Sequence, residues 1–268
     1  MITSKDIPQL GSSKVLLIGE SCIDRYRYGI CDRLSPEAPV PVLKHLYHED
    51  KDGMAKNVFG NLKNLGVEPL LVTNSEPVVK SRYVDERTKQ HLLRVDEGEC
   101  SRLKPLTLSD IEATAGDLNL FDVILFSDYD KGLITSEFAL QVTEKYKDVV
   151  FFVDSKKSDL SCYKNCVLKI NEKEKAELKM KPEACELIVT VGKNGAIWNG
   201  ECFPVDNVEV FDVCGAGDTF FAGLVSCFLV TKNLRKSIKF ANLCASISVQ
   251  KFGTYQIEWE DINEKDRY

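Results

Sequence analysis

The sequence has no apolar run long enough to span a bilayer, and residues 1–13 lack the basic-then-apolar pattern of a signal peptide. It also has no excess of basic residues. The 41 Asp and Glu outnumber the 35 Lys and Arg, which gives a net charge of −6. Because nucleic acids and membrane surfaces attract basic proteins, we expect neither as a partner.

The sequence has few of the side chains that build metal centres or nucleophilic triads. Its ten cysteines include no CxxC pair, and its three histidines lack zinc-ligand spacing. It contains neither a Ser-His-Asp set nor the GxxxxGK[ST] phosphate loop. The cysteine usage indicates reduced thiols and a cytoplasmic protein.

Short apolar runs alternate with amphipathic stretches along most of the 268 residues. This pattern predicts an α/β fold, a doubly wound and mostly parallel sheet with helices on both faces, in one domain over 1–268. Strands are expected at 14–19, 67–73, 123–126, 149–153, 167–170 and 187–191, and helices at 54–65, 109–120, 136–146, 220–230 and 234–251.

Two other stretches predict a small β lobe, the β lid. Three prolines between Ser35 and Val42 exclude a helix, and an extended segment follows at 40–47. Apolar runs at 78–84 and 91–95, separated by polar residues, are typical of a hairpin. The lid segments are therefore about 25–50 and 78–96. Since such a lobe alone exposes an apolar face, we expect it to pair two copies into a homodimer.

Polar residues follow the predicted strands at equivalent places. In chain order they are Asp24, Asp128, Lys131, Lys156, Asn171, Glu174, Thr190 and Asp218. Each alone would be an ordinary solvated loop residue. Because the carboxyl ends of parallel strands meet at one edge of a sheet, we expect this set to converge on a site.

The stretch Gly215-Ala216-Gly217-Asp218 opens the almost wholly apolar helix at 220–230. Small residues at a helix N-terminus offer backbone N–H groups to an anion, usually phosphate. Asp218 either caps the helix or takes a proton from a molecule bound beside the phosphate. With the lysines and the Asn171/Glu174 pair, phosphoryl transfer fits best, with magnesium held through water near that pair.

Residues 212–220 resemble the second signature of the ribokinase (PfkB) family of carbohydrate kinases. The resemblance implies a ribokinase-like fold with a β lid, ATP as phosphoryl donor, Asp218 as base and the amides of Gly215, Ala216 and Gly217 as anion hole. It covers most of the chain. It also implies further roles: magnesium and phosphate at Asn171 and Glu174; nucleotide at Thr190, Gly192 and Gly195; sugar at Asp24, Gly53 and Asn57; and a monovalent cation such as K⁺ at Asp212.

Within that family, the stretches 24–29, 33–42, 127–132 and 154–156 look like those of D-glycero-β-D-manno-heptose 7-phosphate kinases. That branch forms the 1,7-bisphosphate for lipopolysaccharide or other heptose glycans. A substrate that already carries phosphate needs cations. The candidates are Arg33, Arg82, Arg87, Lys131 and Lys156.

The chain departs from the family pattern at Met54 and Lys56 and is short after Val72 and between Leu178 and Glu186. Two alternatives therefore stay open. One is a kinase of the same fold that acts on another sugar or sugar phosphate. The other is a catalytically silent sugar-phosphate-binding relative, although a non-catalyst has no need of Asp218 in the cradle. The nucleotidyltransferase domain of some relatives is absent from this sequence.

Overall fold

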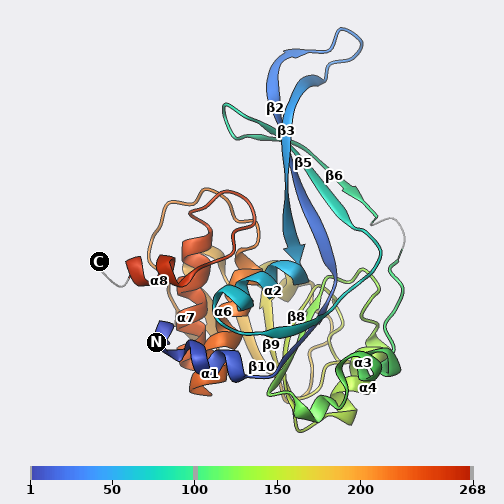
Figure 1. The fold of residues 1–268 in the computed structure, drawn as a ribbon, viewed down its shortest axis with the longest axis vertical. Coiled ribbons are helices and arrows are strands. Elements are labelled where there is room, and N and C mark those ends of the chain that lie inside the picture. The colour runs from blue at the N-terminus through green and yellow to red at the C-terminus, as the bar shows by residue number, and fades with distance from the viewer. Residues whose placement is uncertain (1, 99–101, 266–268) are drawn as a thin grey trace.

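A computed structural model describes residues 2–98 and 102–265 and has an eight-stranded sheet at its centre (Figure 1). The strand order is β12-β11-β10-β9-β8-β7-β1-β4, and all neighbours pair in parallel except at β11 and β12. The strands are β1 (Val15–Gly19), β4 (Pro69–Val72), β7 (Val123–Asp128), β8 (Val150–Ser155), β9 (Cys166–Asn171), β10 (Glu186–Thr190), β11 (Ala196–Trp198) and β12 (Glu201–Phe203). The predicted mostly parallel sheet is confirmed.

Helices cover both faces of this sheet, because successive residues of its buried strands point to opposite sides. In β1, Leu17 belongs to the core under one set of helices and Leu16 to the core under the other. The first set is α1 (Ile7–Ser12), α2 (Ala55–Asn64), α6 (Ala216–Thr231), α7 (Leu234–Ser248) and α8 (Trp259–Lys265). The second is α3 (Leu108–Ala115) and α4 (Ser136–Lys145). The doubly wound architecture is therefore confirmed.

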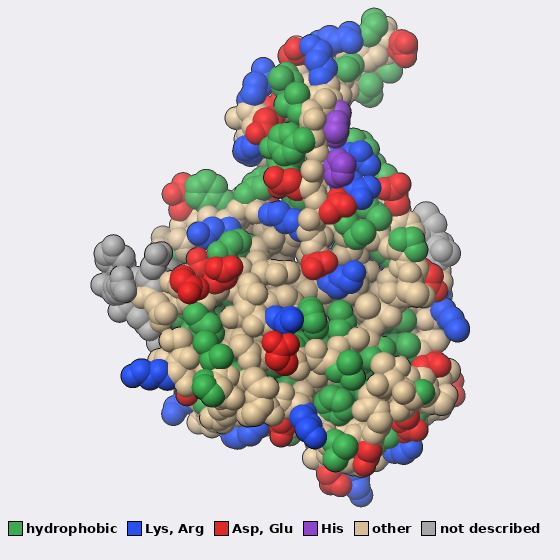
Figure 2. All heavy atoms as spheres, viewed as in Figure 1, with side chains coloured by type: hydrophobic (Ala, Val, Ile, Leu, Met, Phe, Trp, Pro, Cys, Tyr) green, Lys and Arg blue, Asp and Glu red, His purple; other side chains and the backbone are tan. Residues whose placement is uncertain are grey.

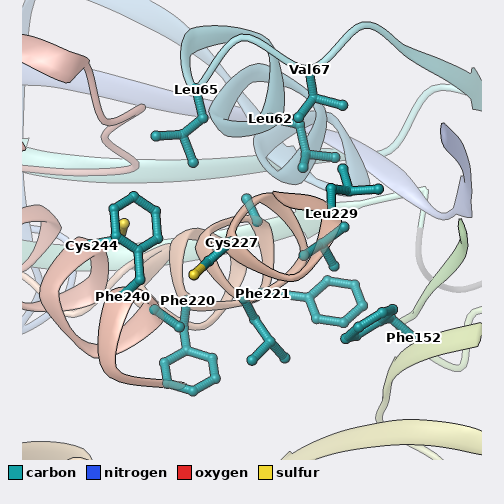
Figure 3. Packing of buried hydrophobic residues seen from close by; sticks show 14 of the residues in the cluster. Leu62, Leu65, Val67, Phe152, Phe220, Phe221, Cys227, Leu229, Phe240 and Cys244 are labelled. Atoms are coloured by element: carbon teal, nitrogen blue, oxygen red, sulfur yellow. The ribbon is translucent and has the colours of Figure 1, made fainter. Parts of the chain in front are cut away.

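Helix α6 is the centre of the first core. Phe220, Phe221 and Leu229 project from different sides of it toward neighbouring elements, and Leu62 of α2 lies across from it (Figure 3). The helix is buried along most of its length because it is apolar on all sides. Packing of this kind holds the N-terminus of α6, and with it Asp218, in one position.

A second sheet forms the lid, with strand order β3-β2-β5-β6. Its strands are β2 (Ser21–Leu34), β3 (Pro41–Met54), β5 (Val79–Asp85) and β6 (His91–Glu97). The antiparallel β5–β6 pair confirms the predicted hairpin. Strands β2 and β3 project from the body as a long hairpin (Figure 1), and hydrophobic side chains lie along the projection between charged ones (Figure 2). The lid joins the body at the ends that carry Asp24 and Gly53.

One predicted helix and two unpredicted segments show how the structure differs locally from the sequence analysis. The helix expected over 109–120 ends at Gly116, whose φ of 76° breaks it, and a 3-10 turn (Leu118–Leu120) follows. The β11–β12 hairpin was not predicted, although Asn199-Gly200 is a strong turn signal. The extended segment before Gly215 joins no sheet, and Val213 in it is exposed. Among the described residues, no helix has both the length and the apolar character needed to cross a membrane.

Candidate active site

Asp218 lies in the first turn of α6, which begins from a left-handed turn. Gly215 has φ 78° and is the N-cap, so only glycine adopts its conformation without strain. Gly215, Ala216 and Gly217 all line a cavity of about 680 Å³, as does Asp218. The Ala216 N–H also makes a 3.3 Å turn hydrogen bond with the Val213 carbonyl. The positive end of a helix thus faces the cavity, an arrangement that favours an anion.

Two neutral donors hold the carboxylate of Asp218. The Tyr129 hydroxyl donates to Oδ1 at 2.6 Å, and the Asn57 amide Nδ2 donates to Oδ2 at 3.0 Å. Asn61 in turn donates to the Asn57 side-chain oxygen at 3.2 Å. Burial raises the pKa of Asp218 above its ordinary value, while the hydrogen bonds from Tyr129 and Asn57 act in the opposite direction. Asp218 makes no side-chain hydrogen bond as a helix cap, and its carboxylate is held in one orientation.

An ion-pair cluster lies beside the cradle. Lys169 Nζ and Asp154 Oδ2 are 2.7 Å apart, and both side chains are buried. A Cβ added to Gly217 would be 3.0 Å from Lys169 Nζ, so the ammonium lies directly against the cradle. Lys156 Nζ bonds Glu174 Oε1 at 2.5 Å and is 3.6 Å from Asp154 Oδ1. Burial alone would raise the pKa of Asp154, but the ammonium groups of Lys169 and Lys156 lower it overall.

Lys169 was not predicted from the sequence, and Asp154 was noted only as part of a motif. A signal for Lys169 existed, because a lysine in the otherwise apolar run 166–170 must be paired to be buried. What the sequence could not show was its partner. Asp154 belongs to the adjacent strand β8, and the register sets Asp154 beside Lys169.

Three of the predicted substrate residues, Asp24, Gly53 and Arg82, form one group in the lid. Arg82 Nη1 of β5 bonds Asp24 Oδ1 of β2 at 2.5 Å, and both side chains are buried. A Cβ on Gly53 would meet Asp24 Oδ2 at 2.4 Å, so glycine is required for β3 to approach β2 here. Asn57, which follows on α2, donates to Asp218. Asp24, Gly53 and Arg82 therefore lie together in the lid, and Asn57 is the predicted sugar residue in direct contact with Asp218.

The predicted nucleotide-side residues Asn171, Thr190, Gly192 and Gly195 line the same cavity, as does Lys156, which was predicted to bind the substrate. Asn171 caps the short helix α5 (Glu172–Glu177), and Glu174 completes a capping box with it. Glu174 is outside the cavity lining but holds Lys156 in place. At the outer end, the walls become apolar, with Val208, Val210, Ala245 and Val249 among them. A cavity with polar walls at one end and apolar walls at the other suits a nucleotide, whose phosphates are charged and whose adenine is largely apolar.

Of the predicted substrate residues, Lys156 lines this cavity, whereas Asp128, Lys131, Arg33 and Arg87 lie elsewhere. Asp128 is buried, and its carboxylate accepts hydrogen bonds from Ser155 and Tyr163 and an ion pair from Lys157. These bonds tie strand β7 to the segment after β8, so a structural role replaces the predicted substrate contact. Lys131 is absent from the cavity lining. Arg33 is exposed near the distal end of β2. Arg87 follows β5, is also exposed, and pairs with Asp85.

Asp212, the predicted monovalent-cation residue, connects two loops. Its Oδ1 accepts the Cys214 N–H at 2.9 Å and its Oδ2 accepts the Gly253 N–H at 3.0 Å. Burial alone would raise its pKa, yet these backbone donors lower it overall. The carboxylate is therefore ionised and fixes the segment before the cradle against the loop around Gly253.

Comparisons with known proteins agree with this geometry. The pfkB family carbohydrate kinase profile matches residues 150–261. The bifunctional protein HldE of a Nitratiruptor species is 33% identical over 95% of this chain, and that of Pseudomonas paraeruginosa is 32% identical over 94%. The chain spans 65% and 63% of the lengths of these two relatives.

Solved structures show the same fold at low sequence identity. Phosphofructokinase-2 from Escherichia coli in complex with potassium has a TM-score of 0.71 at 15% identity, covering 94% of this chain and 97% of that one. Ribokinase from Arabidopsis thaliana complexed with ribose and ATP has a TM-score of 0.66 at 16% identity, covering 96% and 99%. The solved structures show the fold, and the profile match together with the HldE similarity shows that this chain contains a carbohydrate kinase domain of the pfkB family.

Proposed function

We propose that this protein transfers the γ-phosphoryl group of ATP to the anomeric hydroxyl of D-glycero-β-D-manno-heptose 7-phosphate, forming the 1,7-bisphosphate. The observation that carries the proposal is the oriented carboxylate of Asp218 at the mouth of the Gly215–Gly217 cradle. The similarity to HldE proteins favours a heptose phosphate over other sugars. The buried Arg82 beside Asp24 supports a polar, charged acceptor on that side of the base.

The proposed reaction uses this chain's residues as follows. Asp218 accepts the proton of the sugar hydroxyl while the hydroxyl oxygen forms a bond to the γ-phosphorus. The bond between that phosphorus and the β,γ-bridging oxygen breaks, which releases ADP. The α6 N-terminus and the Lys169 ammonium stabilise the negative charge of the moving group. The apolar outer walls receive the adenine. Positioning and charge neutralisation therefore account for most of the catalysis.

The donor set also fits a divalent cation. Within the described residues, Asp154 Oδ1 is buried without a hydrogen-bond partner, and Asp154 lines the cavity. This oxygen has the Lys156 ammonium at 3.6 Å but keeps its lone pairs, and a carboxylate oxygen beside a phosphate cradle suits Mg²⁺, which favours one or two carboxylates plus water and phosphate. Asp154, with Asn171 and Glu174 through water, would hold it, and the ion would supply neutralisation of the nucleotide phosphates.

Asp212 is the residue we propose for K⁺, because each of its carboxylate oxygens keeps a lone pair in addition to the one that accepts a backbone N–H.

A coupled ADP-release assay tests the proposal, with ATP, Mg²⁺ and a panel that contains heptose 7-phosphate, other sugar phosphates and free sugars. We expect the highest kcat/KM with heptose 7-phosphate. The Asp218→Asn variant should fold and bind ATP but lose at least ~10²-fold in turnover, because its amide cannot accept the proton. A higher kcat/KM with another sugar would reassign the substrate. Absence of turnover across the panel would favour the silent sugar-phosphate-binding alternative.

We also propose a cytoplasmic homodimer formed through the lid. Large apolar side chains exposed on the lid support the pairing: Leu34, Val40, Leu46, Tyr47, Leu93 and Val95. Scattered cysteines without a pairing pattern support a reducing compartment. Light scattering at micromolar concentration should give twice the 30.1 kDa chain mass. A monomeric mass would contradict the pairing without affecting the proposed reaction.

A further inference from the structure

Tyr129, in the stretch 127–132, contacts Asp218, and the reaction proposed above gives it no function. Its hydroxyl makes the shorter of the two hydrogen bonds to Asp218, at 2.6 Å against 3.0 Å for Asn57. A carboxylate has about four lone-pair positions, so these two bonds leave room for a substrate hydroxyl. They also remove the freedom of the carboxylate to rotate. The phenol therefore determines which lone pairs remain for the acceptor.

The backbone of Tyr129 is held independently of its side chain. Glu20, fully buried after β1, accepts the Tyr129 N–H at Oε2 (2.7 Å) and the Lys131 N–H at Oε1 (3.3 Å). The two backbone hydrogen bonds to Glu20 thus fix the loop after β7, while the phenol of Tyr129 reaches Asp218.

The ring of Tyr129 lies between two ammonium groups. Lys80 Nζ of lid strand β5 is 5.8 Å from the ring centroid, and Lys156 Nζ at the end of β8 is 5.6 Å from it. Both distances are within the range of cation–π attraction. The ring therefore contacts both the lid and the body beside Asp218. Its orientation is fixed by these two cations as well as by the hydrogen bond of its hydroxyl.

From this geometry we infer that Tyr129 is a positioning residue of the kinase: its hydroxyl keeps Asp218 oriented for the acceptor hydroxyl and stabilises its ionised form. The inference rests on the proposed role of Asp218 as the base. The other titratable groups that face Asp218 are Cys22, Asp154, Lys156 and Lys169. These groups are unchanged when the phenol oxygen alone is removed.

The Tyr129→Phe variant tests the inference through the pH dependence of kcat/KM, measured with ATP and the panel sugar that gives the highest wild-type turnover. Loss of a donor to the ionised carboxylate raises the pKa of Asp218. The acid limb should therefore move to higher pH by about one unit, and kcat/KM below that limb should fall about tenfold, the size of one hydrogen bond to a charged group. An acid limb that coincides with that of the wild type would overturn the inference.

The chain provides a matched control in Tyr163. Its hydroxyl donates to a buried carboxylate, Asp128 Oδ2, at the same distance of 2.6 Å, but neither residue lines the cavity. Tyr163→Phe should lower Tm and leave the acid limb in place. An equal shift in both variants would mean that general loosening of the fold, and not the Tyr129 hydroxyl, sets the limb.

A graded substitution covers the case in which Tyr129→Phe does not fold. Incorporation of 3,5-difluorotyrosine at position 129 keeps the ring and makes the phenol a stronger donor. The acid limb should then move to lower pH, and no movement would overturn the inference. Retained turnover in Asp218→Asn would instead refute the proposed base itself. If Asp218→Asn loses turnover but the acid limb stays in place in the position-129 variants, only the role of Tyr129 would be refuted.

Discussion

A substitution at Gly215 would change the backbone conformation, the local packing and the hydrogen bonding of Asp218 together. Gly215→Ala is therefore an informative perturbation. Its φ is 78°, and a Cβ there would be 2.7 Å from Asn57 Nδ2 and 3.3 Å from Thr254 Cγ2. Asn57 Nδ2 is the atom that donates to Asp218. An added methyl group must therefore displace this donor or move the α6 N-terminus.

Two costs add for Gly215→Ala. A left-handed conformation costs an L-residue about 1–2 kcal/mol relative to glycine. Displacement of Asn57 removes a hydrogen bond to a charged group, worth about 1.5–3 kcal/mol. We expect the free energy of unfolding to fall by about 2.5–5 kcal/mol in total. Because the second cost falls on the base, kcat/KM should fall at least about tenfold.

Gly200→Ala is the matched control. Gly200 has nearly the same φ, 77°, but a Cβ there would meet nothing within 4 Å, and it lies in the β11–β12 turn outside the cavity. It should lose only about 1–2 kcal/mol in a urea titration and keep the wild-type kcat/KM in the ADP-release assay. If Gly215→Ala cost no more stability and no more activity than Gly200→Ala, the assigned contact between Gly215, Asn57 and Asp218 would be wrong.

Two further predictions concern buried charges. Lys169→Met removes the nearer of the two ammonium groups beside Asp154, so a urea titration should show a loss of up to about 3–5 kcal/mol, and the added change Asp154→Leu should restore most of it without restoring turnover. Burial, then repulsion from Asp128, raises the pKa of Glu20 from 4.5 to about 7. The folded state then holds a proton that the unfolded state releases, so Glu20 costs up to about 3 kcal/mol of stability as pH rises from about 4.5 to 7. Glu20→Gln should remove this contribution from the measured pH–stability curve, and an unchanged slope would contradict the assigned titration.

The local chemistry of the site was predictable from the sequence. Glycine and alanine before Asp218, followed by apolar residues, specify a cradle at a buried helix, because both follow from short-range conformational preference and periodicity. The same holds for Asn171, whose capping of α5 needs only its own side chain and the next three residues. The parallel sheet followed from the alternation of strands and helices.

The partners of each charge were decided only by the tertiary structure. Asp128 was predicted to belong to the site because it follows a strand, but Lys157 and Tyr163 hold its carboxylate outside the cavity. Tyr129, the next residue, contacts Asp218 instead. Lys169 became part of the cradle because sheet register set it beside Asp154. Strand ends share an edge by topology, whereas the direction of a side chain depends on loop conformation and on contacts between residues far apart in the chain. Local sequence patterns do not carry that information.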